Sequence, residues 1–357
     1  MKVVALEGDG IGPEVTAAAL EVLEATAAAF DVALHIDVQP FGGSAIDRYG
    51  SALPVQTANA ASAADAVLLG AAGGPQWDDL PREQRPEASL LRLRKASNAY
   101  ANLRPSRCVA GLERYSALRA DAVRGADVLI VRELAGGLYY CEPRGRSEDK
   151  AWNTMRYSTH EVARVARIAF DCARRRRKRL LNVDKANVLE CSAFFRSVVA
   201  GVAREFPDVE LEHAYVDAAA LRLVSRPASI DVLLTENMFG DILSDVAAAL
   251  PGSIGVLPSA SLGGRPSIFE PVHGSAPDIA GAGIANPVGA MLSAAMLLEH
   301  AANRPDAARR LESAVYASLK REPTRDLGGT ATTAAFTRAV KEALLADRQP
   351  GERFGQH

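Results

Sequence analysis

Short apolar runs alternate with longer segments of helical periodicity along almost the whole chain. The runs that predict strands are KVVAL (2–6), LHIDV (34–38), DAVLLG (65–70), ADVLIVREL (126–134), KRLLNVDK (178–185), VELEHAYVD (209–217) and IDVLLTE (230–236). Apolar residues recur at helical spacing over 13–30, 158–178, 188–206, 240–250, 287–301, 306–320 and 333–346. This alternation predicts an α/β protein with a largely parallel sheet.

The composition is typical of a globular chain that is long enough for two domains. Of 357 residues, 48% are hydrophobic and 24% are charged, and the net charge of −2 favours neither nucleic acid nor a membrane as a partner. No apolar run approaches the roughly 20 residues that span a bilayer, and the first residues do not resemble a signal peptide. Four cysteines without CxxC spacing predict a cytoplasmic chain without disulfides; they are at positions 108, 141, 172 and 191.

A basic block, RRRRKR at 174–179, ends one of the helical patterns. It has two interpretations. One is a contact site for nucleic acid, and the other is a solvated helix end whose cations complement the helix dipole. We favour the second, because short basic motifs often match by chance.

The segment 137–158, GLYYCEPRGRSEDKAWNTMRYS, interrupts the alternation of strands and helices. It is polar, rich in turn residues and too long for an ordinary connection. Tyr139, Tyr140, Trp152 and Tyr157 argue against a disordered loop. We expect a functional insertion or an arm that grips a partner.

Two glycine-rich segments are candidate ligand loops. GDGIGPE (8–14) follows the first predicted strand, but its G-x-G-x-G spacing differs from the Rossmann pattern, so a tight turn and a ligand loop are equally open. PVHGSAPDIAGAGIANP (271–287) is more specific, because its small residues let the backbone approach a ligand closely. Asp278 within it can bind a cofactor ribose and repel a 2′-phosphate, which favours NAD over NADP.

Several charged side chains fall at the ends of predicted strands, where ligands of open α/β sheets gather. Lys185 is a candidate general base, although a surface lysine at a strand exit is an equal alternative. Asp217 ends another strand, and Asp241 and Asp245 lie four residues apart after a third. Asp241 is also a candidate N-cap for a helix from about residue 242. Because carboxylate oxygens are hard ligands, the three aspartates predict Mg²⁺ or Mn²⁺ and not zinc.

Three arginines are candidates for binding a substrate with two carboxylates. Arg94 shares a helical face with Leu90, Arg104 is extended because Pro105 follows it, and Arg132 ends a buried strand. Each taken alone is more commonly a surface residue. Their significance depends on whether they converge in space.

Together these segments resemble the isocitrate/isopropylmalate dehydrogenase family of β-decarboxylating dehydrogenases. The resemblance covers essentially the whole chain and rests on GDGIGPE, ANLRP, VRELAGGLYY, WNTMRYS, DKANVL, TENMFGDILSD, GSIGVLPSASLG and EPVHGSAPDIAGAGIANP, in this order. The chain departs from the usual pattern at Glu7 and at Tyr140 and Cys141, which leaves every catalytic match in place.

The resemblance implies a role for each candidate residue. Substrate-binding positions of the family match Arg94, Arg104, Arg132 and Asp217, with an apolar pocket at Leu90, Leu91 and Val188. The catalytic base and acid match Lys185 and Tyr139. The ligands of the divalent metal match Asp217, Asp241 and Asp245. The NAD contacts match Gly74, Glu87, His273, Gly274, Ser275, Ala276, Pro277, Asp278, Ile279 and Asn286.

The resemblance also implies a two-domain α/β fold that is not a standard Rossmann fold. Residues 1–99 plus 252–357 would form a discontinuous NAD-binding domain. Residues 100–251 would carry dimerisation and the substrate and metal sites, with an arm at about 137–158. In similar enzymes the equivalents of Lys185 and Asp217 come from the partner subunit, so a homodimer is expected.

The implied reaction is the NAD-dependent oxidative decarboxylation of (2R,3S)-3-isopropylmalate to 4-methyl-2-oxopentanoate and CO₂ in leucine biosynthesis. Alternatives within the family are D-malate, tartrate and homoisocitrate as substrates. Leu90, Leu91 and Val188 favour an apolar substituent over a third carboxylate. An apolar pocket discriminates by only about 1–3 kcal/mol per methylene, so activity on malate analogues is expected too.

Overall fold

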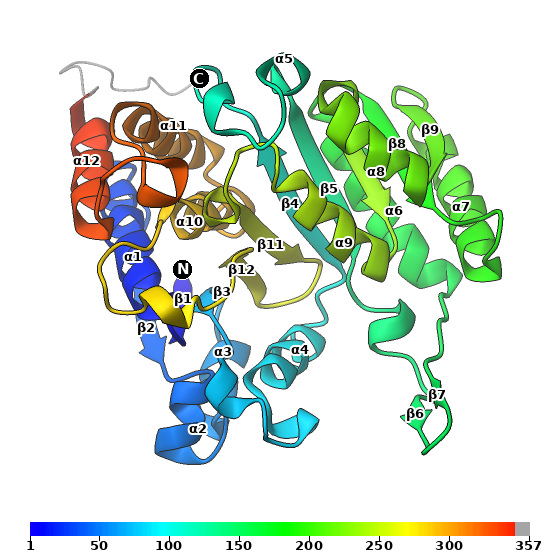
Figure 1. Ribbon diagram of the computed structural model, residues 1–357, viewed down its shortest axis with the longest axis horizontal. Helices are drawn as coiled ribbons and strands as arrows, with labels where there is room; N and C mark the ends of the chain where they lie inside the picture. The colour runs from blue at the N-terminus through cyan, green and yellow to red at the C-terminus, as the bar shows by residue number, and fades with distance from the viewer. Residues whose placement is uncertain (347–357) are drawn as a thin grey trace.

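The computed structural model describes residues 1–346 and contains one ten-stranded sheet of order β2-β1-β3-β12-β11-β4-β5-β10-β8-β9 (Figure 1). The strands are β1 (Lys2–Gly8), β2 (His35–Gln39), β3 (Ala66–Ala71), β4 (Ala101–Arg107), β5 (Asp127–Glu133), β8 (Arg179–Asp184), β9 (Glu210–Tyr215), β10 (Val232–Thr235), β11 (Pro258–Leu262) and β12 (Ser267–Pro271). The expected α/β class and largely parallel sheet are confirmed. Only the three central pairs, β12–β11, β11–β4 and β4–β5, are antiparallel.

Helices follow most strands, as the alternation predicts. They are α1 (Gly12–Ala29), α2 (Gly43–Tyr49), α3 (Val55–Ser62), α4 (Pro86–Ala96), α5 (Ala120–Val123), α6 (Thr159–Arg174), α7 (Glu190–Val202), α8 (Val216–Ser225), α9 (Asn237–Ala247), α10 (Val288–His300), α11 (Pro305–Arg321) and α12 (Thr333–Ala346). Local signals explain several boundaries. Pro13 stands in the first turn of α1, and Ser158 forms a capping box with Glu161 at the start of α6.

The two faces of the sheet are covered differently. On one face a single apolar core runs across both halves, from Val3 and Phe269 through Leu103 to Val131 and Val232, under α1, α6, α10 and α11. On the other face there are two separate cores. One, around Leu69 and Ile268, packs against α3 and α4, and the other, around Ile130 and Leu233, packs against α8 and α9. In Figure 1, α8 and α9 lie in front of the sheet, while α2, α3 and α4 gather below β3.

Polar side chains occupy the second face between these two cores. Because side chains alternate along a strand, Leu103 points into the continuous core while Asn102 and Arg104 point to the second face. Their neighbours there are Ser259 and Ser261 of β11 and Glu270 of β12, which are buried although polar. The centre of the sheet therefore offers a polar strip between two layers of helices.

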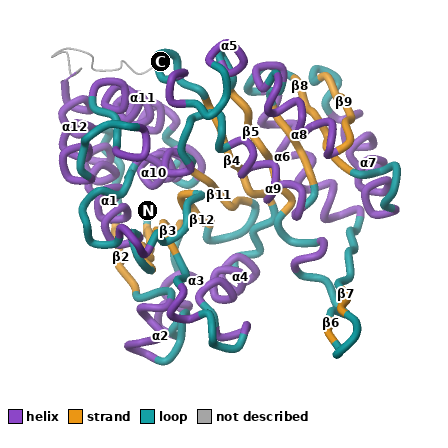
Figure 2. Tube along the Cα trace, viewed as in Figure 1, coloured by secondary structure: helices purple, strands orange, loops and turns teal. Residues whose placement is uncertain are grey.

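The segment 137–158 forms an arm. It contains a short antiparallel hairpin of β6 (Gly145–Arg146) and β7 (Ala151–Trp152), and it extends away from the rest of the molecule (Figure 2). Trp152 near its tip is 47% exposed. An ordered projection with an exposed aromatic side chain is suited to contacting another chain.

Most of the basic block is exposed at the end of α6, as the solvated helix end that we favoured predicts. α6 ends at Arg174, which forms a bidentate pair with Asp208. Arg176 is only partly exposed and pairs with Asp127 at 2.9 Å and with the buried Asp231 at 2.9 Å. These pairs tie the end of α6 to the starts of β5 and β10. Internal carboxylates thus engage cations of the block, which weakens the nucleic-acid interpretation.

Candidate active site

Two of the three candidate arginines contact Asp241, at the polar strip of the sheet, and the third, Arg94, is close enough to lower the pKa of Asp241. Arg132 on β5 donates a hydrogen bond to Asp241 Oδ1. Nη2 of Arg104, on β4, lies 3.6 Å from the same oxygen, and Nη1 lies 3.8 Å from Asp245. The hydroxyl of Tyr139 donates to Asp241 Oδ2 at 2.8 Å. The sequence could propose these residues one by one, and the fold brings them together.

Local packing fixes Arg132 in this position. Asn237, at the start of α9, accepts hydrogen bonds from Arg132 Nε at 3.0 Å and from Arg132 Nη2 at 2.8 Å. A side chain at Gly240 would meet Arg132 Cγ at 2.5 Å, so only glycine lets α9 lie directly on the guanidinium stem. Arg132 is therefore held from two sides, with Nη1 directed at the site.

The burial of Arg94 and Arg104 shows how much positive charge gathers at the site. Arg94 on α4 is buried and pairs with Glu270 at 2.5 Å, yet its Nε has no hydrogen-bond partner. Burial first, and then the cations of Arg132 and Arg94, lower the pKa of Arg104 to about 10. Arg104 nevertheless remains charged at neutral pH. Arg94 lowers the pKa of both Arg104 and Arg132, whereas Glu270 raises that of Arg94. Three guanidiniums buried this close together favour an anionic ligand between them.

Asp241 remains ionised among these cations. Burial would raise the pKa of its carboxyl, but Arg132, the Tyr139 hydroxyl and Arg104 outweigh that effect and lower the pKa below its usual value. The expected N-cap role of Asp241 is wrong, because α9 begins at Asn237 and Glu236 is its N-cap. Asp241 lies inside the helix, so Asp245 follows it by one turn on the same face.

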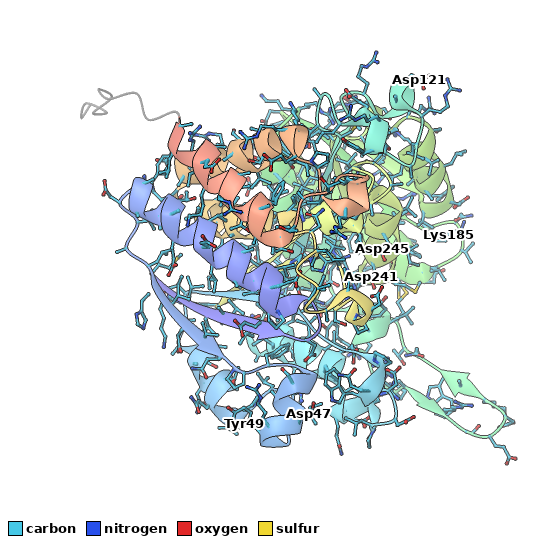
Figure 3. All side chains as sticks on the ribbon, turned by 60° about the vertical axis from the view of Figure 1, so that its left-hand side comes forward. Asp47, Tyr49, Asp121, Lys185, Asp241 and Asp245 are labelled. Carbon is cyan, nitrogen blue, oxygen red and sulfur yellow. The ribbon has the colours of Figure 1, made fainter. Side chains whose placement is uncertain are left out.

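Asp241 and Asp245 lie together, and Lys185 lies apart from them (Figure 3). Lys185 follows β8, two strands from β5, and its Nζ donates to Asp217 Oδ1 at 2.6 Å. Asp217 is in the first turn of α8 and not at the end of a strand as expected. Within residues 1–346, no three His, Cys, Asp or Glu side chains gather at one metal position. One chain therefore contributes two carboxylates to the site and holds the third elsewhere.

The apolar candidates divide in the same way. Leu90 and Leu91 are half-buried on α4, where Leu90 precedes Arg94 by one turn. Val188 belongs to the segment after Lys185 and is 68% exposed. Leu90 and Leu91 thus flank the arginine site, whereas Val188 accompanies Lys185.

The candidate cofactor loop offers unused polar groups and open space. His273 is buried, its Nδ1–H can donate to the Gly274 carbonyl at 2.9 Å, and its Nε2 has no partner. Nothing lies within 4 Å of the position where Gly274 would carry a side chain. Asp278 stands exposed on a 3₁₀ turn, Pro277–Ile279. These features fit a ligand that lies along the loop.

The remaining cofactor candidates border this loop or open α4. Ala276 has a φ of 38°, and the backbone oxygen of Ser275 accepts from Ile11 N at 2.8 Å. Asn286 is buried and donates to Asp326 at 2.9 Å. Gly74 and Glu87 are not part of this loop. Gly74 precedes the 3₁₀ turn Pro75–Trp77, and Glu87 is in the first turn of α4. The segments holding these candidates come from opposite ends of the sequence.

Sequence reasoning missed the residues that hold the candidates in place. They are Asn237, Ser244, Glu270 and Asp326, which pair respectively with Arg132, Arg104, Arg94 and Asn286. Three of the four lie within segments that carry the family resemblance, so the signal was present. Their partners could not be assigned, because each pair joins residues at least 40 positions apart.

Comparison with known proteins identifies the family of this chain. The sequence profile of the isocitrate/isopropylmalate dehydrogenase family matches residues 2–344. The chain belongs to this family. Relatives include the 3-isopropylmalate dehydrogenases of Deinococcus radiodurans, 53% identical over 96% of this chain and 97% of the relative, and of Gloeobacter violaceus, 51% identical over 97% of each.

Solved structures confirm the expected dehydrogenase fold. The isocitrate dehydrogenase of Methylococcus capsulatus is 36% identical, with a TM-score of 0.85 over 96% of this chain and 99% of the other. A β-decarboxylating dehydrogenase of Thermococcus kodakarensis is also 36% identical, with a TM-score of 0.81 over 98% and 99%. The chain is thus an enzyme of the isocitrate/isopropylmalate dehydrogenase type. None of its described helices is long and apolar enough to cross a membrane.

A buried carboxyl beside the site gives a testable pH dependence. Glu236 is 1% exposed, accepts from Ser192 and leaves Oε2 unpartnered, and burial raises its pKa to about 7. The native state thus favours the neutral form, and that stabilisation is lost as pH rises from about 5 through 7. We expect Glu236→Gln to gain stability relative to wild type by about 3 kcal/mol between pH 5 and pH 8.

Urea unfolding at both pH values, at fixed protein concentration, measures this gain. Glu210→Gln, at an exposed position on β9, serves as the control. If Glu236→Gln and wild type keep the same difference at both pH values, the carboxyl does not change its charge over this range.

Proposed function

We propose that the protein catalyses the NAD⁺-dependent oxidative decarboxylation of (2R,3S)-3-isopropylmalate to 4-methyl-2-oxopentanoate and CO₂, a step of leucine biosynthesis. The convergence of Arg94, Arg104 and Arg132 around Asp241 is the observation that carries the proposal. Relatives about 50% identical over nearly the whole chain are named 3-isopropylmalate dehydrogenases, and their name supports this substrate.

The substrate has two carboxylates and one branched alkyl group, and the site has a counterpart for each. The arginines can fork the two carboxylates and fix the reacting carbon in one orientation. Leu90 and Leu91 offer apolar surface one turn before Arg94. A third carboxylate, as in homoisocitrate, would lose its hydration against these leucines without gaining a cation. This argument favours the isopropyl group.

A divalent cation fits the aspartate pair. Asp241 and Asp245 are like charges one helical turn apart, and their repulsion becomes attraction when a cation lies between them. Asp217 would complete the set of hard oxygen ligands, which suits Mg²⁺ or Mn²⁺. The bound cation would stabilise negative charge that develops at the C2 oxygen of the substrate.

A homodimer would bring the separated residues together. Lys185, Asp217 and Val188 would then complete the site of the partner chain. Exposed apolar side chains on the same half support this arrangement: Phe194 on α7, Leu221 and Val224 on α8, Ile242 on α9 and Trp152 on the arm. We further infer that residues 1–99 with 252–346, and residues 100–251, act as two domains that share the sheet between β11 and β4. Residues 347–357, which were expected in the first domain, lie outside the described residues.

The side chains then have distinct roles. NAD⁺, bound along residues 273–279 with Gly74 and Glu87, would supply the acceptor for the hydride from C2. Lys185 Nζ takes the proton of the C2 hydroxyl. After CO₂ leaves, the Tyr139 hydroxyl donates a proton to C3. Burial raises the pKa of Tyr139, so the hydroxyl holds its proton at neutral pH. One proton is removed and one returned, so the reaction releases no net proton.

Four substrates compared side by side test the proposal. We expect NADH formation to be fastest with 3-isopropylmalate, slower with D-malate and tartrate, and slowest with homoisocitrate, and to depend on Mg²⁺ or Mn²⁺. A preference for homoisocitrate or tartrate would assign the chain to another reaction of the same family.

All four cysteines are free thiols, which supports a cytoplasmic location.

Asp278 gives a test of cofactor choice. We expect Asp278→Lys to move the NAD⁺/NADP⁺ preference towards NADP⁺ by about tenfold or more, because a carboxylate that repels the 2′-phosphate becomes a cation that attracts it. The ratio of kcat/KM values for the two cofactors measures the change. Glu24→Lys, at an exposed position on α1, provides a control for added charge. An unchanged ratio would show that Asp278 does not face the ribose.

A further inference from the structure

The GDGIGPE segment (8–14) forms hydrogen bonds with several loops that are distant from it in the sequence. Asp9 is 2% exposed, and its carboxylate accepts hydrogen bonds from the backbone N–H groups of Gly43, Ser44 and Gly73, each at 2.8 Å. These donors lie 34 or more residues away in the sequence. One side chain after β1 therefore fixes the start of α2 and the turn after β3.

The fit around Asp9 leaves no room for rearrangement. A side chain at Gly42 would meet Asp9 Oδ2 at 2.4 Å, and φ at Gly42 is 84°. The described hydrogen-bond partners of the carboxylate are backbone N–H groups of fixed direction. A buried carboxylate held in this way is costly to move, because each lost donor exposes an unsatisfied charge.

Gly73, which Asp9 holds in place, is also in contact with Glu87. The φ of Gly73 is 101°, and a side chain there would meet Glu87 Oε1 at 2.2 Å, so the Glu87 carboxylate lies directly against the Gly73 backbone. Glu87 opens α4, and the same helix carries Arg94 two turns later. The line from Asp9 through Gly73 to Glu87 thus ends on the helix that carries Arg94.

The other half of GDGIGPE serves a different loop. Ile11 N donates to the Ser275 carbonyl at 2.8 Å, and Glu14 Oε1 accepts from Ala285 N at 2.8 Å. These contacts support residues 273–286 without involving the Asp9 carboxylate. The two loops proposed to bind NAD therefore have separate anchors within one seven-residue motif.

We propose that Asp9 is a positioning residue that holds the Gly73–Gly74 turn and Glu87 for the nicotinamide half of NAD⁺, an inference that rests on the proposed function. The nicotinamide must reach the substrate held by Arg94, and Glu87 shares α4 with that arginine. The adenosine half then belongs to residues 273–286, which Ile11 and Glu14 support. Asp9 itself touches neither ligand.

Asp9→Asn tests the proposal with the smallest change of shape. The amide replaces one acceptor oxygen by an NH₂ group that faces either Ser44 N or the N–H groups of Gly43 and Gly73. It also removes the negative charge that all three donors share, so each of the remaining hydrogen bonds is weaker and the turn is held less firmly. We expect the Kd of NADH and the KM of NAD⁺ to rise about tenfold. AMP, which lacks the nicotinamide half, should bind with unchanged affinity, and kcat at saturating NAD⁺ should change less than KM.

Asp65→Asn is the matched control. Asp65 lies before β3 in the same half and accepts a backbone hydrogen bond from Lys2 N at 2.8 Å, but at the opposite end of the strand from Gly73. We expect it to leave NADH affinity unchanged. NADH fluorescence and AMP calorimetry, with thermal unfolding of each variant, give the comparison.

The outcomes separate this inference from the proposed function. If wild type does not bind NADH, the function itself is wrong. If wild type binds NADH and Asp9→Asn binds it equally well, Asp9 does not position the turn. If NADH and AMP affinities fall together in Asp9→Asn, the residue acts only through general stability, which also overturns the proposal.

Discussion

Mixed dimers of Lys185→Met and Asp245→Asn recover about one quarter of wild-type activity, although each variant alone is inactive. This is the result we expect if each site combines Asp241 and Asp245 of one chain with Lys185 and Asp217 of its partner. Random pairing makes half of the dimers heterodimers, and each heterodimer has one intact site out of two, because a two-fold axis relates the sites. Two tags with sequential purification isolate the heterodimer, which should have about half of wild-type activity.

The control is a mixture of Lys185→Met with Lys185→Met carrying the second tag, which should stay inactive. If the Lys185→Met and Asp245→Asn heterodimer is inactive as well, all site residues come from one chain. That chain would then have to rearrange strongly, since Lys185 now bonds Asp217 and lies apart from Asp241.

Asp245→Asn should lower kcat by about 10³-fold while the protein stays folded, because the change removes a charged oxygen from the proposed cation site. The Asp245 side chain is 65% exposed, and its ion pair with Arg104 is long at 3.8 Å, so the fold does not depend on it. Direct titration with Mn²⁺, followed by electron paramagnetic resonance, should show weakened binding.

Asp121→Asn removes an equally exposed carboxylate far from the site (Figure 3) and should leave both kcat and Mn²⁺ affinity unchanged. Wild-type turnover in Asp245→Asn would exclude this residue as a ligand. A fall in kcat with normal Mn²⁺ binding would instead assign Asp245 to the support of Arg104.

The outer parts of the sheet were predictable from sequence, and its centre was not. Runs such as KVVAL and DVLLT are apolar because helices cover both faces of their strands. β4 and β11 read ANLRPSR and PSASL, because one of their faces carries the polar strip. A search for apolar runs does not detect such segments, because polar residues interrupt them. The missing strands are thus the ones that form the floor of the site.

The site was predictable in its parts and not in its pairings. The resemblance to the family named Arg94, Arg104 and Arg132, but their convergence depends on the antiparallel pairing of β4 with β5 and on the position of α4. The ion pairs of the basic block could not be predicted for the same reason, since their partners Asp127, Asp208 and Asp231 come from distant segments. Asp9 gave no signal beyond its motif, because its partners are backbone groups of any sequence.

The unequal covering of the two faces also decides how the effects of mutations combine. A cavity made in the continuous core, for example at Phe269 or Leu103, disturbs packing that both halves share. A cavity at Ile268 or Leu233 stays within one of the separate cores. Changes in different separate cores should therefore add in free energy, whereas changes across the continuous core should couple. Sequence change on that side of the sheet is constrained by both halves of the molecule at once, while the side with the separate cores leaves each half free to vary alone.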